Sequence, residues 1–445
     1  MTSPNTSAQA RDAIADLSHA EDSSPSIPGK DRSREAILYV GPLDLGLTTS
    51  KSVNGVVTRL RGACEMQSRT GSSQWRVEWR SGALAPLGDA SGPKSHHVAT
   101  VLRRDGDEET TEFDVFEYAW SAHFAESWQT QNVVARALRA LGALFQVGAF
   151  LRFFNKAPRR AEKGRLQLVL AVVAILVVAL YFGFVVWAAI ETFLQLAELP
   201  LPLVGDGTAL ITFPQWMTIA MTALGAAGFT KLRNGLSTVG AGLLSANAYL
   251  RTADRRGVLM HGLLEQAERF RDDDRYRSVT VISYSFGSVL AIDALFPKEH
   301  PPERAFEKFK KLVTIGSAYD FVRAAAPKYL ENRHASAGVP EKWINVYAPI
   351  DLLGSSFTKD AKSPGEADIV VARVGAENTK TKTKDVMPHE NISYDNGVRV
   401  SLANALEFYG FTSHAAYWGV DDKPDRNVFA LVVDKLYPEP GGHLR

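Results

Sequence analysis

The sequence predicts a doubly wound α/β domain that is interrupted by a two-helix transmembrane hairpin. Short β-rich segments without strict alternation of polar and apolar residues indicate strands covered on both faces, as in a parallel sheet. Apolar residues at helical spacing at 259–270 and 287–296 flank one of these segments, which is the pattern of an α/β domain. The strand-like segments are 36–40, 113–118, 278–283, 311–316 and 343–348, with one further short strand expected near 369–374.

Composition sets the limits of the prediction. The chain has 445 residues, enough for a sizeable core. Its 50 Lys and Arg residues balance 49 Asp and Glu residues, so charge gives no reason to expect nucleic acid as a partner. The single cysteine, Cys64, excludes an intrachain disulfide, and no Cys/His cluster has the spacing of zinc ligands. We therefore expect neither a metal nor a cofactor.

Two uncharged stretches, about 166–190 and 208–229, predict the hairpin. At about 1.5 Å per residue the first is long enough to cross roughly 30 Å of bilayer hydrocarbon. The second is weaker because it contains Pro214 and several threonines, and a pair of buried helices in a large cap is the alternative reading. Lys and Arg gather before the first stretch and after the second, whereas the connector holds only acidic charges. The positive-inside rule then places the main domain and both termini on the cytoplasmic side of a two-span membrane protein.

Strand-like segments on both sides of the hairpin indicate that it is inserted into one domain. We expect a disordered tail at 1–34, rich in Ser, Pro, Asp and Ala. The first part of the domain follows at 35–130, the membrane insertion at 131–245 and the second part of the domain at 246–445. The insertion begins with an arginine-containing amphipathic segment that fits either a helix on the inner membrane surface or an ordinary core helix.

The stretch SVTVISYSFGSVLAIDAL, at 278–295, predicts a sharp turn from strand to helix. The side chain at the apex of such a turn projects over the carboxyl edge of the sheet, and small residues two before and two after prevent a collision. Ser283 and Gly287 meet this requirement around Ser285, whereas turns centred on Ser283 or Ser288 have bulky flanking residues. Ser285 is therefore the candidate nucleophile, with an ordinary tight connection as the alternative.

The same turn supplies a backbone donor for a tetrahedral intermediate. The N–H of Phe286 lies at the helix N-terminus, where the helix dipole favours negative charge. A second donor is expected from the loop after the first strand, VGPLDLG. Because Pro42 has no N–H, Leu43 is the candidate for this second donor of the oxyanion hole.

A serine nucleophile needs a histidine base and a carboxylate that orients it. Asp351, in WINVYAPIDLLG, follows a predicted strand end and is the preferred acid, and Asp320, in GSAYDFV, is the alternative. His414, in FTSHAAYWG, is the preferred base and stands beside a Tyr-Trp pair expected to wall a pocket. His389, in a polar loop, is the alternative base.

Together these motifs resemble the α/β-hydrolase superfamily, specifically bacterial lipase/esterase-like serine hydrolases. The matching segments are SYSFGS (283–288), TIGSAYD (314–320), WINVYAPID (343–351) and HAAYW (414–418). The resemblance covers roughly 245–435 and implies a mostly parallel α/β-hydrolase-type sheet with flanking helices. It also implies Ser285 as nucleophile, Asp351 as acid and His414 as base. Two positions depart from the pattern: Ser283 stands where histidine or glycine is commoner, and the first-strand loop reads Val-Gly-Pro in place of His-Gly.

The sequence thus predicts a membrane-anchored serine hydrolase that cleaves an ester through an acyl-enzyme intermediate. A lipid acyl ester is one candidate substrate, and acyl transfer to another acceptor would use the same residues. A catalytically silent hydrolase fold that serves as a membrane scaffold or signalling protein is the alternative. The expected partners are an ester or lipid substrate and the membrane, but no nucleic acid.

Overall fold

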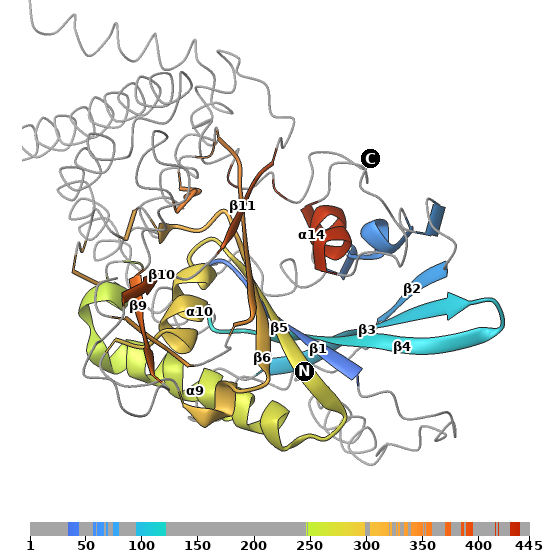
Figure 1. Ribbon diagram of the computed structural model, residues 1–445, viewed down its shortest axis with the longest axis horizontal. Coiled ribbons are helices and arrows are strands. Elements are labelled where there is room, and N and C mark those ends of the chain that lie inside the picture. Colours follow the sequence, from blue (N-terminus) through green and yellow to red (C-terminus); the bar gives the residue numbers. More distant parts are fainter. Residues whose placement is uncertain are drawn as a thin grey trace, which may run out of the picture. The chain divides into compact units, whose positions relative to one another are not determined.

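The structure is a computed structural model (Figure 1). It describes residues within 34–43, 57–69, 74–79, 95–121, 246–298, 303–357, 370–374, 384–394, 414–417 and 428–436, with gaps of one to three residues inside several of these ranges. The tail predicted at 1–34 lies outside this part of the chain, except that Arg34 begins the first strand. The predicted insertion at 131–245 also lies outside it.

An eight-stranded sheet is the main element, with the order β11-β8-β6-β5-β1-β4-β3-β2. The strands β4, β1, β5, β6, β8 and β11 run parallel to one another, and β3 is antiparallel to both β4 and β2. The prediction of a mostly parallel α/β sheet is confirmed at this level. The bounds are β1 Arg34–Val40, β2 Gln74–Trp79, β3 Ser95–Asp105, β4 Glu108–Tyr118, β5 Tyr276–Tyr284, β6 Phe309–Ile315, β8 Lys342–Tyr347 and β11 Glu390–Ser393.

Strand β1 lies between segments that are far apart in sequence. It pairs with β4 on one side and with β5 on the other, so strands from before and after residues 122–245 share one sheet. A second sheet of three strands has the order β10-β9-β7, with bounds Lys384–Val386, Val370–Val374 and Arg333–Ser336. Its middle strand is the short strand expected near 369–374.

Alternate residues of β1 enter two different apolar cores. Ala36, Leu38 and Val40 pack into one buried cluster, and Ile37 and Tyr39 pack into the other. Since side chains along a strand point alternately to opposite faces, a strand covered on both faces has no polar face. This explains the unbroken apolar runs that predicted the central strands.

Helices cover both faces of the large sheet, as Figure 1 shows. α9 (Ala253–Asp272) and α10 (Gly287–Leu295) pack in the first cluster, and α14 (Val428–Leu436) packs in the second. Every residue of α10 is buried, which accounts for its apolar composition on all sides. The helix ends where Pro297 follows Phe296, because a residue before proline is disfavoured in the helical conformation.

The strands β2 and β3, which pair antiparallel, were not predicted. β3 and β4 are joined by a tight turn in which Gly106 has a φ of 65°, a conformation that glycine adopts without a steric penalty. Their outer halves, around HVATVLRRD and EETTEF, mix charged residues with apolar ones. A continuous apolar run therefore marks only the inner end of β4, at 113–118.

In the part of the chain that the structure describes, no helix is both long enough and apolar enough to span a bilayer. The predicted spans at 166–190 and 208–229 lie outside that part. The membrane hairpin therefore stays a prediction.

Candidate active site

Ser285 stands at the apex of the turn between β5 and α10. Its φ of 56° lies in the left-handed region, which costs an L-residue on the order of 1–2 kcal/mol. Two backbone hydrogen bonds hold it there: its N–H donates to Ile315 O at 2.9 Å, and its carbonyl accepts from Ser288 N–H at 3.1 Å. A strained residue fixed by its neighbours at the carboxyl edge of a sheet is typical of functional sites.

The neighbouring serines have a different environment. Ser283 and Ser288 are fully buried, and the Ser283 hydroxyl donates to Val313 O at 3.0 Å. The two hydroxyl oxygens lie 3.3 Å apart. Ser285 Oγ instead lies 2.7 Å from a histidine nitrogen. Of the three serines in the segment SYSFGS, Ser285 is the one placed beside a histidine.

Gly287 permits a close approach between the start of α10 and the end of β1. A Cβ atom at this position would lie 2.2 Å from Gly41 O and 2.5 Å from Val40 O. Both are backbone atoms, which cannot rotate away as a side chain can. The sequence pattern of a small residue two positions after the apex therefore has a direct steric cause.

We expect Gly287→Ala to lower the free energy of unfolding by about 1–3 kcal/mol, because the added methyl group forces the 41–43 loop away from the turn. The matched control is Gly257→Ala on the exposed side of α9, where a Cβ would meet nothing within 4 Å. That control should raise stability by about 0.5–1 kcal/mol, since alanine is the better helix former. Urea unfolding of both variants checks the difference, and equal effects would contradict it.

Ser285, His414 and Asp351 form a continuous hydrogen-bonded chain. His414 Nε2 lies 2.7 Å from Ser285 Oγ, and His414 Nδ1 lies 2.8 Å from Asp351 Oδ2. The three residues come from the turn after β5, the loop after β8 and a segment near the C-terminus, so only the fold brings them together. Distances in this range allow the proton to pass from serine to histidine, while the carboxylate fixes the ring.

Asp351 is almost fully buried but well supplied with donors. Its Oδ1 accepts the Leu353 N–H at 2.8 Å, and its Oδ2 accepts the Tyr417 hydroxyl at 2.8 Å in addition to contacting His414. A buried carboxylate is tolerated when hydrogen bonds compensate its lost hydration. Burial, followed by the negative charge of Asp351, raises the pKa of Tyr417 well above its usual range, so the phenol stays protonated and donates.

Packing fixes the orientation of the histidine. The ring of Tyr284, the last residue of β5, stacks on His414 with centroids 5.3 Å apart, and its hydroxyl donates to the His414 backbone carbonyl. Gly316 follows β6 with a φ of 52°, and a Cβ there would lie 3.2 Å from His414 Cε1 and 2.7 Å from Tyr417 Cε2. The absence of a side chain at Gly316 makes room for both rings.

The alternatives proposed for acid and base are placed differently. His389 Nε2 lies 3.0 Å from Asn391 Nδ2, and the His389 ring lies against Trp343 and Phe357, so it is not the histidine beside Ser285. Asp320 lies outside the described residues. Tyr417, expected to wall a pocket, is fully buried and bonds to the acid instead.

The proposed oxyanion donors lie in a common apolar setting. No acceptor for the Phe286 N–H is found among the described residues. The Ser285 N–H, in contrast, already donates to Ile315 O. The Phe286 ring packs between Trp120 and Tyr249, with centroids 6.2 and 5.3 Å away. Trp120 Nε1 donates to Gly41 O at 3.0 Å and so fixes the loop that carries the half-buried Leu43. The role of Leu43 stays a prediction.

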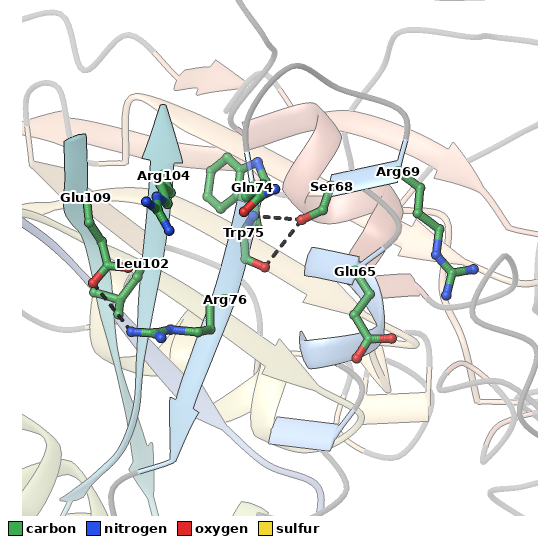
Figure 2. A pocket seen from close by; sticks show the side chains of 9 residues that line it. All are labelled: Glu65, Ser68, Arg69, Gln74, Trp75, Arg76, Leu102, Arg104 and Glu109. Carbon is green, nitrogen blue, oxygen red and sulfur yellow. Dashed lines mark hydrogen bonds and ion pairs between the residues drawn. The ribbon is translucent and has the colours of Figure 1, made fainter. Parts of the chain in front are cut away.

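A groove of about 450 Å³ lies elsewhere, along β2 and β3 (Figure 2). Arg76, on its rim, is paired with Glu78 at 2.7 Å and with Glu109 at 3.4 Å. The groove shares no residue with the serine, histidine and aspartate constellation and is not part of that site. Its lining residues are Glu65, Ser68, Arg69, Gln74, Trp75, Arg76, Leu102, Arg104 and Glu109.

Comparison with known proteins gave no match to a family model, to a curated protein or to a solved structure. Within the described ranges, no group of three or more His, Cys, Asp or Glu side chains has an arrangement that could hold a metal ion. The case for function therefore depends on the geometry of the site itself.

Proposed function

We propose that this protein is a serine hydrolase that cleaves a carboxylic ester through an acyl-enzyme intermediate. The observation that carries the proposal is the chain of two hydrogen bonds, 2.7 and 2.8 Å long, from Ser285 Oγ through His414 to Asp351. The left-handed backbone of Ser285 at the end of a central parallel strand supports the same conclusion. This arrangement also supports the likeness to α/β hydrolases.

The chemistry follows from the three groups. His414 Nε2 takes the hydroxyl proton as Ser285 Oγ attacks the ester carbonyl, and Asp351 holds the proton on Nδ1 so that Nε2 is the basic nitrogen. Backbone N–H groups, with Phe286 as the first candidate, stabilise the negative oxygen of the tetrahedral intermediate. His414 then protonates the leaving alkoxide. Water activated by the same nitrogen attacks the acyl-enzyme, and the acid leaves as Ser285 recovers its proton.

A lipid acyl ester is the substrate class that we favour within this proposal. The support is the predicted hairpin, which would fix the catalytic domain against the inner leaflet. Ser285 and His414 are only 9% and 8% exposed, so a substrate must leave water to reach them, which costs an acyl chain less free energy than a large polar group. Hydrolysis of p-nitrophenyl butyrate and p-nitrophenyl palmitate by the purified full-length protein compares short and long acyl groups.

A fluorophosphonate probe tests the proposed function. The full-length wild-type protein should be labelled covalently, because the probe traps a serine that a neighbouring histidine deprotonates. Ser285→Ala should abolish labelling. Ser288→Ala, in the same turn and buried, is the matched control and should retain it. Folded wild-type protein that is not labelled would contradict the proposal and favour the catalytically silent scaffold, and labelling of Ser285→Ala would exclude Ser285 as the nucleophile.

A further inference from the structure

The hydroxyl of Tyr417 joins the acid of the site to the backbone after β8. Its oxygen lies 2.8 Å from Asp351 Oδ2 and 2.6 Å from the nitrogen of Ala348. The backbone N–H of Ala348 can only donate and an ionised carboxylate can only accept. The single hydroxyl proton of Tyr417 must therefore point at Asp351.

This donor shares one carboxylate oxygen with the histidine. His414 Nδ1 also lies 2.8 Å from Asp351 Oδ2, while Oδ1 is taken by the Leu353 N–H. Each of the two donors partly neutralises the negative charge on this oxygen, so each hydrogen bond is weaker than it would be alone. The carboxylate therefore attracts a protonated imidazole less strongly than it would without Tyr417.

Close packing keeps the phenol in place. A Cβ at Gly354 would lie 2.7 Å from the Tyr417 hydroxyl oxygen and 2.4 Å from Asp351 Oδ2, so only glycine fits beside this pair. Tyr394 stacks on the ring of Tyr417, with centroids 6.0 Å apart. The segments after β8 and β11 therefore both hold the Tyr417 side chain in this position.

We propose that Tyr417 is a positioning residue that lowers the pH at which His414 becomes available as the base, by sharing the carboxylate of Asp351. The inference depends on the proposed serine hydrolase. Among the described residues, the titratable side chains that contact His414 are Asp351, Tyr284 and Tyr417, and no cationic side chain contacts it. Removal of the Tyr417 hydroxyl consequently takes one hydrogen bond from the Asp351 carboxylate and leaves every other charge near His414 unchanged.

The test is the pH dependence of the fluorophosphonate labelling rate, which needs no natural substrate. In Tyr417→Phe, the midpoint of the acidic limb should move to higher pH by about half a unit, which is about a threefold change in proton affinity. The matched control is Tyr284→Phe, which removes a buried hydroxyl that bonds to the His414 backbone and not to the carboxylate. That control should leave the midpoint in place, even if its plateau rate falls.

A second replacement keeps the test decisive should Tyr417→Phe fail to fold, since Phe leaves the buried Ala348 N–H without its acceptor. 3-Fluorotyrosine at position 417 keeps both hydrogen bonds and is the stronger donor, so the midpoint should move to lower pH. An unmoved midpoint in a labelled protein, or an equal shift in Tyr284→Phe, overturns the role of Tyr417. Absence of labelling in the wild type overturns the proposed function instead.

Discussion

Ser285→Ala and His414→Ala are each expected to lower kcat for p-nitrophenyl ester hydrolysis by about a million-fold, and the double variant should be no slower than either single variant. The reason is that Ser285 Oγ and His414 Nε2, 2.7 Å apart, perform one proton transfer together. Once one partner is missing, the other has nothing to act on. Steady-state rates of the three variants measure the effect.

Asp351→Asn separates the acid from the pair. The amide keeps the volume of the side chain but donates where the carboxylate accepts, so it favours the wrong tautomer of His414 and should cost roughly ten-thousand-fold in kcat. With its oxygen kept at the Leu353 N–H, its nitrogen takes the Oδ2 position and presents N–H donors to His414 Nδ1 and to the Tyr417 hydroxyl. If the losses in Ser285→Ala and His414→Ala multiply in the double variant, the two residues act independently and the mechanism is wrong.

Much of the candidate site follows from local sequence rules. Ser285 could be chosen because a sharp strand-to-helix turn requires small flanking residues, and the 2.2 Å approach of Gly41 O to a Cβ at Gly287 is the physical form of that rule. Asp351 could be chosen because a residue just past a parallel strand lies at the carboxyl edge of the sheet. Both rules act over a few residues, and for that reason they can be read from sequence.

The contacts between distant segments could not be predicted in this way. The choice between His414 and His389 depends on which loop reaches Ser285 across 129 residues of sequence, and no local pattern encodes that distance. The hydrogen bond from Tyr417 to Asp351 was not predicted for the same reason. A tyrosine three positions after a histidine is as consistent with a pocket wall as with a donor to the acid. The local signal that could have indicated it is Gly354, a small residue close behind the acid.

The fold shows the same division between local and distant information. The central strands are apolar runs because both of their faces are covered, and this property is visible in each segment alone. The sheet order is not visible, because β1 pairs with β5 across more than two hundred residues. The strands β2 and β3 were missed because the outer part of an antiparallel sheet tolerates charge on its exposed face.

Asp293, on α10 behind the turn, is the centre of a buried polar network. Arg333 Nη1 lies 2.6 Å from Asp293 Oδ1, and both side chains are buried. The hydroxyls of Tyr249 and Tyr329 both donate to Asp293 Oδ2. Burial, and then the negative charge of Asp293, raises the pKa of both tyrosines, so they remain donors. Arg333 also donates to Phe296 O at 2.8 Å, which ties β7 to the end of α10.

Arg333→Met is therefore expected to lower the free energy of unfolding by about 3–5 kcal/mol, because it leaves the Asp293 carboxylate buried without its cation. The matched control is Arg269→Met, whose exposed partner Glu265 lies four residues away on α9, and it should cost only about 0.3–0.5 kcal/mol. Urea unfolding of the full-length protein measures both. Adding Asp293→Asn to Arg333→Met should recover part of the loss, since a neutral amide can still accept from Tyr249 and Tyr329. A double variant less stable than Arg333→Met would show instead that the carboxylate contributes to stability without the arginine.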